Sequence, residues 1–288
     1  MTTAWHSDDF AARLLAARGF VFDLDGTLVL GDKRNQGIEA LPGGDALLRR
    51  LEDRGTDYRI LTNGTVKTPA QISAALRNAG LDVPQERVMT PSTVAARYFS
   101  NSGMKKIMVL GVEGVSQPLI DAGLTVVRPG DDEPTSDADA IFIGWYRQIH
   151  MDEVEAACEA VWNGAQLFAA SMVPFFATRN GRALGSSRAI SAMITSITGA
   201  EATPLGKPSP HALKDAAEQM GCATDDLVVF GDDPALEVRM ALEGGAVAVG
   251  VHTGVAGAEA FTDLPDAERP HGSFPDIGEF DRYFAALL

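Results

Sequence analysis

The chain has 288 residues of ordinary globular composition, with 45% hydrophobic and 22% charged residues and a formal net charge of −15. This length allows one or two domains. The acidic balance argues against a nucleic-acid or anionic-membrane partner, because both favour a basic surface. An anionic substrate must therefore be held by local cations, dipoles or a metal.

Cysteine and histidine usage sets further limits. Cys158 and Cys222 form neither a metal-binding spacing nor a disulfide framework, so a reducing cytoplasm fits best. The five histidines are scattered, without a helical pair, which argues against a zinc site. No apolar run approaches the length of a membrane span, and the first residues lack the apolar core of a signal peptide. We expect a cytoplasmic protein with no membrane partner.

Apolar runs alternate with helical patterns along the chain, which is typical of a mainly parallel sheet covered by helices. The predicted strands are 20–24, 57–61, 106–111, 139–144, 166–170, 226–231 and 246–251. The predicted helices are 8–18, 43–54, 69–79, 91–101, 114–122, 151–163, 187–198, 209–220 and 235–243. Residues 104–200 make their own strands and helices, so we predict an inserted domain there. It interrupts a discontinuous core of residues 1–103 and 201–288.

The most informative segment is the end of the first predicted strand, which carries Asp23, Asp25 and Gly26. Open α/β sheets bind ligands at the carboxyl ends of their strands. Residues i and i+2 of a strand point to the same side, so both carboxylates are predicted to aim at one point. Such a pair favours a divalent cation, and Gly26 permits the tight turn that follows. The alternative is a solvated acidic turn.

Two later segments place further polar groups at strand or helix ends. Thr62 and Asn63 follow the strand 57–61, where a hydroxyl, an amide and backbone N–H groups can bind a phosphoryl oxygen. Thr-Asn-Gly is also common in ordinary turns. Lys207 precedes a helix whose predicted cap is Ser209, so the lysine and the helix dipole can neutralise an oxyanion. The alternative is a solvated lysine in a loop.

A second acid pair, Asp232 and Asp233, follows the strand 226–231. Asp232 could complete a magnesium site with Asp23, and Asp233 could orient a ligand or a bound water. A helix-capping acidic loop is the alternative. Magnesium-assisted phosphoryl transfer with a carboxylate nucleophile is indicated by these groups together: the first acid pair, the hydroxyl of Thr62, Lys207 and Asp232.

These motifs, in this order, resemble those of the haloacid dehalogenase superfamily, specifically its NagD-like phosphatases of subfamily IIA. The resemblance covers about residues 17–257 and rests on Asp-Leu-Asp-Gly-Thr (23–27), Leu-Thr-Asn (61–63), Gly-Lys-Pro-Ser-Pro (206–210), Gly-Asp-Asp (231–233) and His-Thr-Gly-Val (252–255). It implies a Rossmann-like, doubly wound parallel-sheet core with an inserted C2-type α/β cap. The implied activity is Mg²⁺-dependent hydrolysis of a small phosphorylated metabolite through an aspartyl-phosphate.

The resemblance also implies roles for single residues. Asp23 matches the nucleophile, and Asp25 matches the general acid that later activates water. The implied metal ligands are Asp23, Asp232 and the backbone carbonyl of Asp25. Lys207 matches the cation that offsets charge on the nucleophile and the phosphate, and Thr62 joins it among the catalytic residues. The predicted phosphate-binding residues are Gly26, Thr62, Asn63, Gly64, Lys207 and Asp233.

The chain departs from the family pattern at several positions. Glu237 stands where the family usually has an aspartate, and Gly64 replaces a common second asparagine. The usual cap motifs are replaced at residues 144–146 and 171–176. Four cap residues could form an aromatic and cationic surface that selects the leaving group, or could be ordinary cap core and surface residues: Tyr146, Arg147, Phe176 and Arg179.

Two other functions stay open at this point. The altered cap and Glu237 are compatible with a phosphate-ligand sensor that has lost useful turnover. A dehalogenase, in which the aspartate attacks carbon, is a further alternative. The intact acid pair, Lys207 and Asp232 argue against it, because attack on carbon requires neither Asp25 nor a metal. A homodimer is expected from the resemblance alone.

Overall fold

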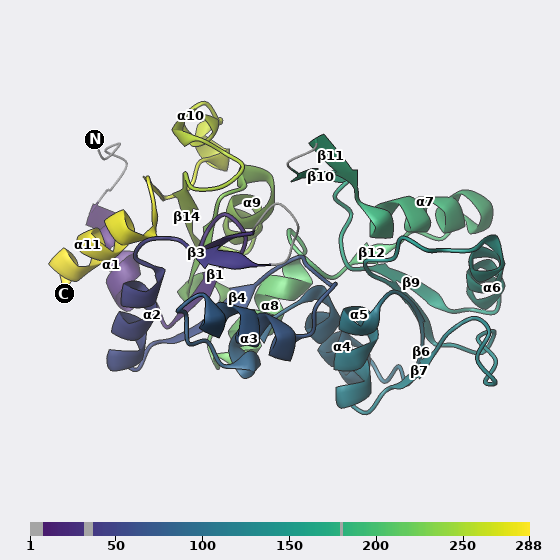
Figure 1. Cartoon of the computed structure of the whole chain (residues 1–288). Coiled ribbons are helices and arrows are strands. Elements are labelled where there is room, and N and C mark those ends of the chain that lie inside the picture. The colour runs from purple at the N-terminus through teal and green to yellow at the C-terminus, as the bar shows by residue number, and fades with distance from the viewer. Residues whose placement is uncertain (1–7, 32–36, 179–180) are drawn as a thin grey trace. The chain divides into compact units, whose positions relative to one another are not determined.

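The computed structural model describes residues 8–31, 37–178 and 181–288, which divide into two compact units (Figure 1). The first unit comprises residues up to Thr62, Ile72–Val88 and Ala212–Leu288; the second comprises Asn63–Gln71 and Met89–His211. Each unit contains its own parallel sheet, and the second unit interrupts the first along the chain. The predicted α/β class with an inserted α/β domain is confirmed.

The first unit is built on a six-stranded sheet in the order β15-β14-β13-β1-β4-β5. The strands are β1 (Gly19–Phe22), β4 (Asp57–Leu61), β5 (Val88–Met89), β13 (Leu227–Gly231), β14 (Val247–Val251) and β15 (Gly272–Phe274). β1 lies in parallel between β13 and β4, with Phe22 opposite Phe230 and Ile60. A short antiparallel pair follows β1, namely β2 (Val29–Gly31) and β3 (Ile38–Ala40).

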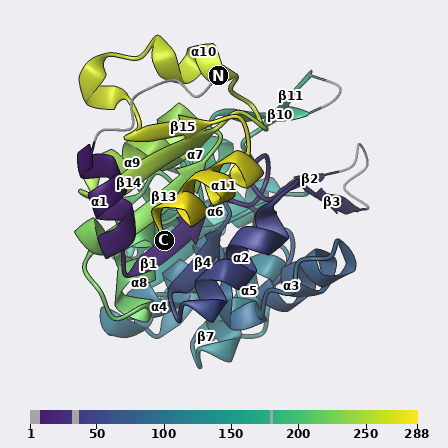
Figure 2. The same cartoon turned by 90° about the vertical axis from the view of Figure 1, so that its left-hand side faces the viewer.

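Helices cover this sheet, and an aromatic core forms on the face covered by α2 and α11 (Figure 2). The α-helices wholly or partly in this unit are α1 (Asp8–Ala16), α2 (Gly44–Asp53), α3 (Pro69–Asn78), α8 (Pro210–Gln219), α9 (Arg239–Glu243), α10 (Ala258–Thr262) and α11 (Ile277–Leu287). A π-helix, η3 (Pro234–Val238), precedes α9, and single 3₁₀ turns lie at η1 (Gln85–Arg87), η2 (Thr224–Asp226) and η4 (Asp266–Glu268). The ring of Phe230 lies 4.8 Å from that of Phe22 and 4.6 Å from that of Phe280. Alternate residues of the strands thus pack against α11.

The second unit has a five-stranded parallel sheet in the order β12-β9-β8-β6-β7. Its strands are β6 (Lys106–Leu110), β7 (Thr125–Val127), β8 (Ala140–Ile143), β9 (Gln166–Ala169) and β12 (Thr203–Pro204), and an antiparallel pair is formed by β10 (Phe175–Thr178) and β11 (Gly181–Leu184). Its helices are α4 (Pro91–Asn101), α5 (Glu113–Asp121), α6 (Met151–Trp162) and α7 (Ser186–Thr198). The compact unit includes α4 because the ring of Phe99 packs on Phe142 and Phe168. A division into core and cap at residues 104 and 200 stays a prediction.

Several elements differ from the sequence prediction. β1 ends at Phe22 rather than at residue 24, and the helix predicted at 235–243 begins as the π-helix η3. β15 and α11 were not predicted, although the sequence carries a helix signal for α11: Asp276 is a residue type that caps helices, and Phe280 and Phe284 are spaced four apart. In the structure, Asp276 accepts a hydrogen bond from Glu279 N, and both rings are buried. The short strands carry too few residues for a period to be recognised.

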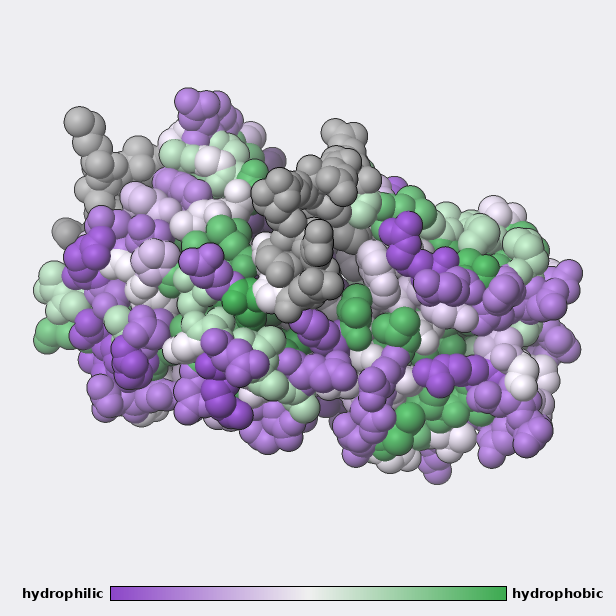
Figure 3. Space-filling view, viewed as in Figure 1, coloured by the Kyte–Doolittle hydropathy of each residue, from purple (hydrophilic) through white to green (hydrophobic). Residues whose placement is uncertain are grey.

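Within the described part of the chain, no helix combines the length and the apolar character needed to cross a bilayer. Hydrophilic residues cover much of the face shown in Figure 3, with smaller apolar patches between them. This distribution is the one expected for a chain with a net charge of −15.

The aromatic contacts of α11 lead to a stability prediction. Phe280→Ala removes a fully buried ring that contacts Phe230, Phe274 and Phe284, and we expect it to lower the free energy of unfolding by about 3–5 kcal/mol. Leu288→Ala, at a residue that is 51% exposed at the end of the same segment, should change it by less than about 0.5 kcal/mol. Urea unfolding followed by circular dichroism measures both. Equal effects of the two variants would show that α11 does not complete the core.

Candidate active site

Two of the predicted acids lie at the carboxyl edge of the first unit's sheet. The main-chain N–H of Asp23, directly after β1, donates to the carbonyl of Phe230 in β13 at 2.9 Å. Asp232 directly follows β13, so the two aspartates leave neighbouring parallel strands at the same edge. Both residues are buried, with 6% and 4% of their surfaces exposed. This is the edge at which open α/β sheets bind ligands.

Asp23 and Asp25 have different surroundings, contrary to the symmetric picture drawn from strand alternation. β1 ends at Phe22, so the alternation stops before either aspartate. Asp23 is buried and accepts a hydrogen bond from Thr27 Oγ1 at 3.3 Å. Asp25 is exposed and forms an isolated bridge with Val29. The turn, rather than the strand, places Asp25 in solvent.

Two glycines surround the carboxylate of Asp232. A Cβ on Gly26 would lie 2.5 Å from Asp232 Oδ2, and a Cβ on Gly254 would lie 1.8 Å from the same atom. Gly26 also has a φ of +90°, which L side chains rarely adopt. The amide of Val255 donates to Asp232 Oδ2 at 2.6 Å, and the hydroxyl of Thr253 donates to the carbonyl of Gly26. Residues 253–255 therefore hold both the Asp23 loop and the Asp232 carboxylate.

Residues 252–255 have no predicted role, although they are part of the family resemblance. The available signal is their position, because they follow the valine-rich strand β14 as Asp23 follows β1 and Asp232 follows β13. His252 contacts two neighbouring elements: its Nε2 lies 2.5 Å from Ser273 Oγ in β15, and its ring stacks on Phe261 in α10. Burial lowers the pKa of His252, so the ring stays neutral at neutral pH.

Asp233 and Glu237 stabilise the loop after β13. Asp233 caps η3, because its Oδ1 accepts a hydrogen bond from Ala235 N at 2.8 Å. The capping alternative thus applies to Asp233, and its predicted contact with a ligand stays a prediction. Glu237 is 2% exposed, and its Oε2 accepts from the main-chain N–H of Asp233 at 3.2 Å. A Cβ on Gly231 would lie 2.3 Å from the Glu237 side chain. The glutamate side chain therefore packs directly against Gly231 at the end of β13.

Thr62, at the end of β4, is 3% exposed and belongs to the first unit. The next residues, Asn63 and the exposed Gly64, belong to the second unit together with Lys207. The Asn63 amide pairs with the backbone of Lys207 on both sides: Nδ2 donates to Lys207 O at 2.9 Å, and Lys207 N donates to Oδ1 at 2.8 Å. The loop of Lys207 is therefore fixed to the segment that follows Thr62.

The loop of Lys207 is buried, and the functional role predicted for this lysine stays a prediction. Lys207 is 2% exposed, so it is not the solvated lysine of the alternative interpretation. Ser209 Oγ accepts a hydrogen bond from His211 N at 3.3 Å, at the start of α8, which confirms the predicted cap. Gly206 permits this approach, because a Cβ there would lie 2.3 Å from the carbonyl of Ala170 and 2.5 Å from Asn63 Oδ1.

The four predicted specificity residues of the cap have different surroundings. Tyr146 packs against the core of the second unit and its hydroxyl donates to Glu153 at 2.7 Å, as expected for a structural residue. Arg147 is exposed and lies over the ring of Trp145, at 5.7 Å from its centroid. Phe176 is described by its backbone in β10, and Arg179 lies outside the described residues.

A magnesium ion fits the donors at the carboxyl edge of the first sheet. In the described ranges, no three His, Cys, Asp or Glu side chains are grouped as a metal site. The predicted set has only two side-chain carboxylates, Asp23 and Asp232, with the main-chain carbonyl of Asp25. Magnesium is commonly held by one or two carboxylates, with waters and substrate phosphate completing its coordination. Buried carboxylate oxygens on neighbouring strands suit this hard cation.

Known proteins resemble this chain over nearly its whole length. Residues 20–125 match the model of the haloacid dehalogenase-like hydrolases, and residues 204–280 match a second HAD-hydrolase-like model. Dihydroxyacetone phosphatase of Corynebacterium glutamicum is 30% identical over 241 residues, which are 82% of each protein. The chain belongs to the haloacid dehalogenase-like hydrolases. An acid sugar phosphatase of Staphylococcus aureus is 26% identical over 264 residues, 91% of this chain and 96% of the relative.

Two further proteins are similar to this chain in sequence or in fold. The 5'-nucleotidase YutF of Bacillus subtilis is 27% identical over 267 residues, 92% of this chain and 98% of the relative. The solved structure of NagD from Escherichia coli has the same fold, with a TM-score of 0.79 and 24% identity, and the likeness covers 91% of this chain and 98% of NagD. The chain thus shares the fold of NagD.

The glycine cradle around Asp232 can be tested with a matched pair. Gly254→Ala places a methyl group against Asp232 Oδ2, whereas Gly257→Ala introduces one where no atom lies within 4 Å. Gly254→Ala must displace the carboxylate, so we expect a rise of about tenfold or more in the Mg²⁺ concentration that gives half-maximal phosphate release, equivalent to about 1.4 kcal/mol of binding. Gly257→Ala should leave it unchanged. If both variants need the same Mg²⁺ concentration, the cradle does not position Asp232.

Proposed function

We propose that this hydrolase is a magnesium-dependent phosphatase of small phosphomonoesters that works through a covalent phosphate on Asp23. The observation that carries the proposal is the pair of buried carboxylates, Asp23 and Asp232, on neighbouring strand ends, with Asp25 exposed beside them. A phosphate ester brings further negative charge to this edge. The proposal therefore requires a cation, and magnesium suits the oxygen donors.

The proposed first step uses two chemically distinct aspartates. A carboxylate oxygen of Asp23 attacks phosphorus, the bond from phosphorus to the ester oxygen breaks, and Asp25 gives a proton to the departing alkoxide. Burial and the Thr27 hydrogen bond orient Asp23 for attack. Solvent exposure lets Asp25 exchange its proton between steps.

In the second step water replaces the aspartate. Asp25, now ionised, takes a proton from water, the water oxygen bonds to phosphorus, and the bond between phosphorus and Asp23 breaks. Phosphate leaves and Asp23 is regenerated. Magnesium, when bound to Asp23, Asp232 and the carbonyl of Asp25, would offset the charge of the carboxylates and phosphate.

The remaining predicted residues bind the phosphate in this proposal. Lys207 supplies a positive charge, and its loop is fixed by the Asn63 amide pair. The hydroxyl of Thr62 and the backbone N–H groups of Gly26 and Gly64 are proposed as hydrogen-bond donors to phosphoryl oxygens. The homodimer and the cytoplasmic location stay predictions.

The substrate is proposed only by class. One relative is named a dihydroxyacetone phosphatase and another a 5'-nucleotidase, so the names of the relatives do not agree on the leaving group. Phosphate release from sugar phosphates, nucleotides, phosphoglycolate, pyridoxal phosphate and polyol phosphates would identify it. Tight binding without release from any of them would instead favour the phosphate-ligand sensor.

The nucleophile is tested by Asp23→Asn. The amide is a poor nucleophile, so kcat for 4-nitrophenyl phosphate should fall by at least about a thousandfold. Asp53→Asn, at an exposed acid ending α2, is the matched control and should keep wild-type turnover. Circular dichroism checks that both variants are folded. Wild-type turnover in Asp23→Asn would contradict covalent catalysis at this residue.

The metal is tested by its removal. After dialysis against EDTA, phosphate release should stop, and added Mg²⁺ should restore it. Asp232→Asn should raise the Mg²⁺ concentration for half-maximal activity by about tenfold or more, which is about 1.4 kcal/mol of lost binding. Asp225→Asn, at the opposite end of β13, should not change it. Full activity in EDTA would rule out the metal-dependent reaction.

A further inference from the structure

The helix that follows Asp232 begins with an unusual turn. η3 is a π-helix in which the N–H of Arg239 donates to the carbonyl of Pro234, five residues earlier. An α-helix pairs residues that are four apart, so this turn contains one extra residue. Single π-helical turns are frequent at functional sites. The extra residue determines which side chain lies over the start of the helix.

Two reciprocal hydrogen bonds close the start of η3. Asp233 Oδ1 accepts from Ala235 N at 2.8 Å, and Glu237 Oε2 accepts from Asp233 N at 3.2 Å. In an ordinary capping box, the glutamate that reaches back to the cap is the third residue of the helix. That position is Leu236 here, and Glu237 is the fourth. The pair is thus a capping box displaced by one residue, which matches a turn with one extra residue.

Glu237 contacts the residues on both sides of Asp232. Its carboxylate accepts from the N–H of Asp233. On the other side, a Cβ on Gly231 would overlap the Cβ, Cγ and Oε2 atoms of Glu237, so this side chain occupies the space that a side chain at 231 would need. Glu237 is 2% exposed. The main chain of Asp232 is therefore held between two contacts made by one buried side chain.

A different segment holds the carboxylate of Asp232. The N–H of Val255 donates to Asp232 Oδ2 at 2.6 Å, and Gly26 and Gly254 leave room for this oxygen. A carboxylate that binds a metal must present its oxygens in one direction, and its hydrogen-bonded neighbours set that direction. Glu237 thus fixes the main-chain end of this residue, and Val255 fixes its carboxylate end.

We infer that Glu237 is a positioning residue for Asp232 and acts through the length of its side chain rather than through its negative charge. The inference rests on the proposed function, in which Asp232 binds Mg²⁺. An aspartate at position 237 is one methylene too short to place an oxygen where Glu237 Oε2 accepts from Asp233 N. A glutamine has the required length, and its carbonyl oxygen accepts the same hydrogen bond.

The alternative role for Glu237 is a contact with the metal through water, which depends on the negative charge. The two roles predict opposite orders for two variants. If charge matters, Glu237→Asp keeps the Mg²⁺ affinity and Glu237→Gln loses it. If length matters, Glu237→Gln keeps the affinity and Glu237→Asp loses it.

Calorimetric titration of the full chain with Mg²⁺ alone, without substrate, distinguishes these roles. Glu237→Gln should bind Mg²⁺ within about threefold of the wild-type affinity, whereas Glu237→Asp should bind it about tenfold or more weakly. Thermal unfolding in EDTA checks that both variants are folded. A merely structural residue would change the unfolding midpoint and leave the Mg²⁺ affinity of the folded protein unaltered.

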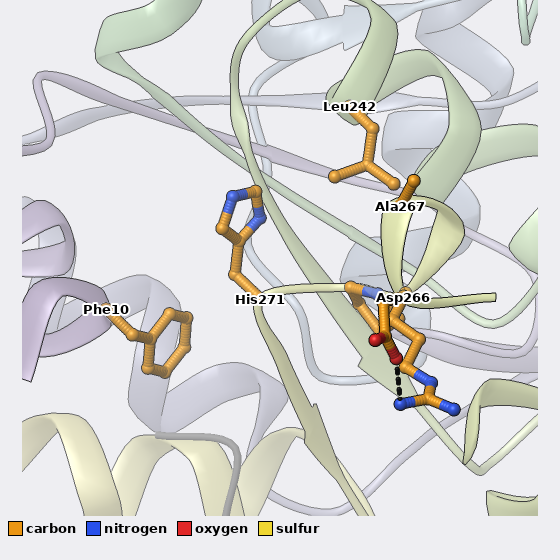
Figure 4. A pocket seen from close by; sticks show the side chains of 7 residues that line it. Phe10, Leu242, Asp266, Ala267 and His271 are labelled. Carbon is orange, nitrogen blue, oxygen red and sulfur yellow. Dashed lines mark hydrogen bonds and ion pairs between the residues drawn. The ribbon is translucent and has the colours of Figure 1, made fainter. Parts of the chain in front are cut away.

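Glu243→Gln is the matched control, because it removes the same charge at the far end of the same helical segment. Glu243 is exposed at the end of α9, where it pairs with Arg239. Its neighbour Leu242 lines, with His271, a separate pocket of about 350 Å³ before the start of β15 (Figure 4). Glu243→Gln should bind Mg²⁺ as the wild type does.

A second measurement needs no metal. In EDTA, amide hydrogen exchange followed by NMR should show the Asp233 N–H protected in the wild type and in Glu237→Gln, and exchanging about tenfold or more faster in Glu237→Asp. This readout reports the hydrogen bond itself, so it does not depend on phosphatase activity.

The inference is overturned if Glu237→Asp binds Mg²⁺ as well as the wild type, or if Glu237→Gln is weakened as much as Glu237→Asp. Equal protection of the Asp233 amide in the two variants would also overturn it. Each of these results leaves the proposed phosphatase reaction in place. A wild-type protein that binds no Mg²⁺ would overturn both proposals together.

Discussion

The structure depends on the burial of two carboxylates at neighbouring strand ends. Parallel pairing of β1 and β13 fixes Asp23 and Asp232 side by side at one sheet edge. Like charges in a low-dielectric setting destabilise each other, and a bound cation removes that cost. The proposed chemistry uses a bound cation at this edge, and glycines 26 and 254 leave space for the carboxylate of Asp232.

The same edge gives different surroundings to two aspartates that are only two residues apart, for which we propose different roles. Asp23 is buried and oriented, whereas Asp25 is turned into solvent because β1 ends before it. A nucleophile benefits from a fixed position, and a proton carrier benefits from access to water. The difference arises from the turn that Gly26 permits, since its φ is +90°.

The sequence predicted those elements whose hydrophobic pattern and capping residues lie within one short segment. The strand 57–61 and the helix 91–101 appear with the predicted bounds, and Ser209 caps α8. The sequence did not predict β15, because this strand is short and its pairing with β14 depends on contacts distant in sequence. It did not predict α11 either, although the spacing of Phe280 and Phe284 is that of a buried helix face. It also gave no role to Val255, whose contact with Asp232 exists only after β13 and β14 have paired. Burial of Lys207 likewise depends on tertiary structure.

The central claim is that Asp23 becomes phosphorylated during turnover. The most direct measurement is acid quenching during steady-state hydrolysis, followed by borohydride reduction, which converts an aspartyl-phosphate to homoserine, and peptide mass spectrometry. The account predicts homoserine at residue 23, and none there when substrate is omitted. Homoserine at residue 25 or 232, or at no residue while phosphate is being released, would contradict it.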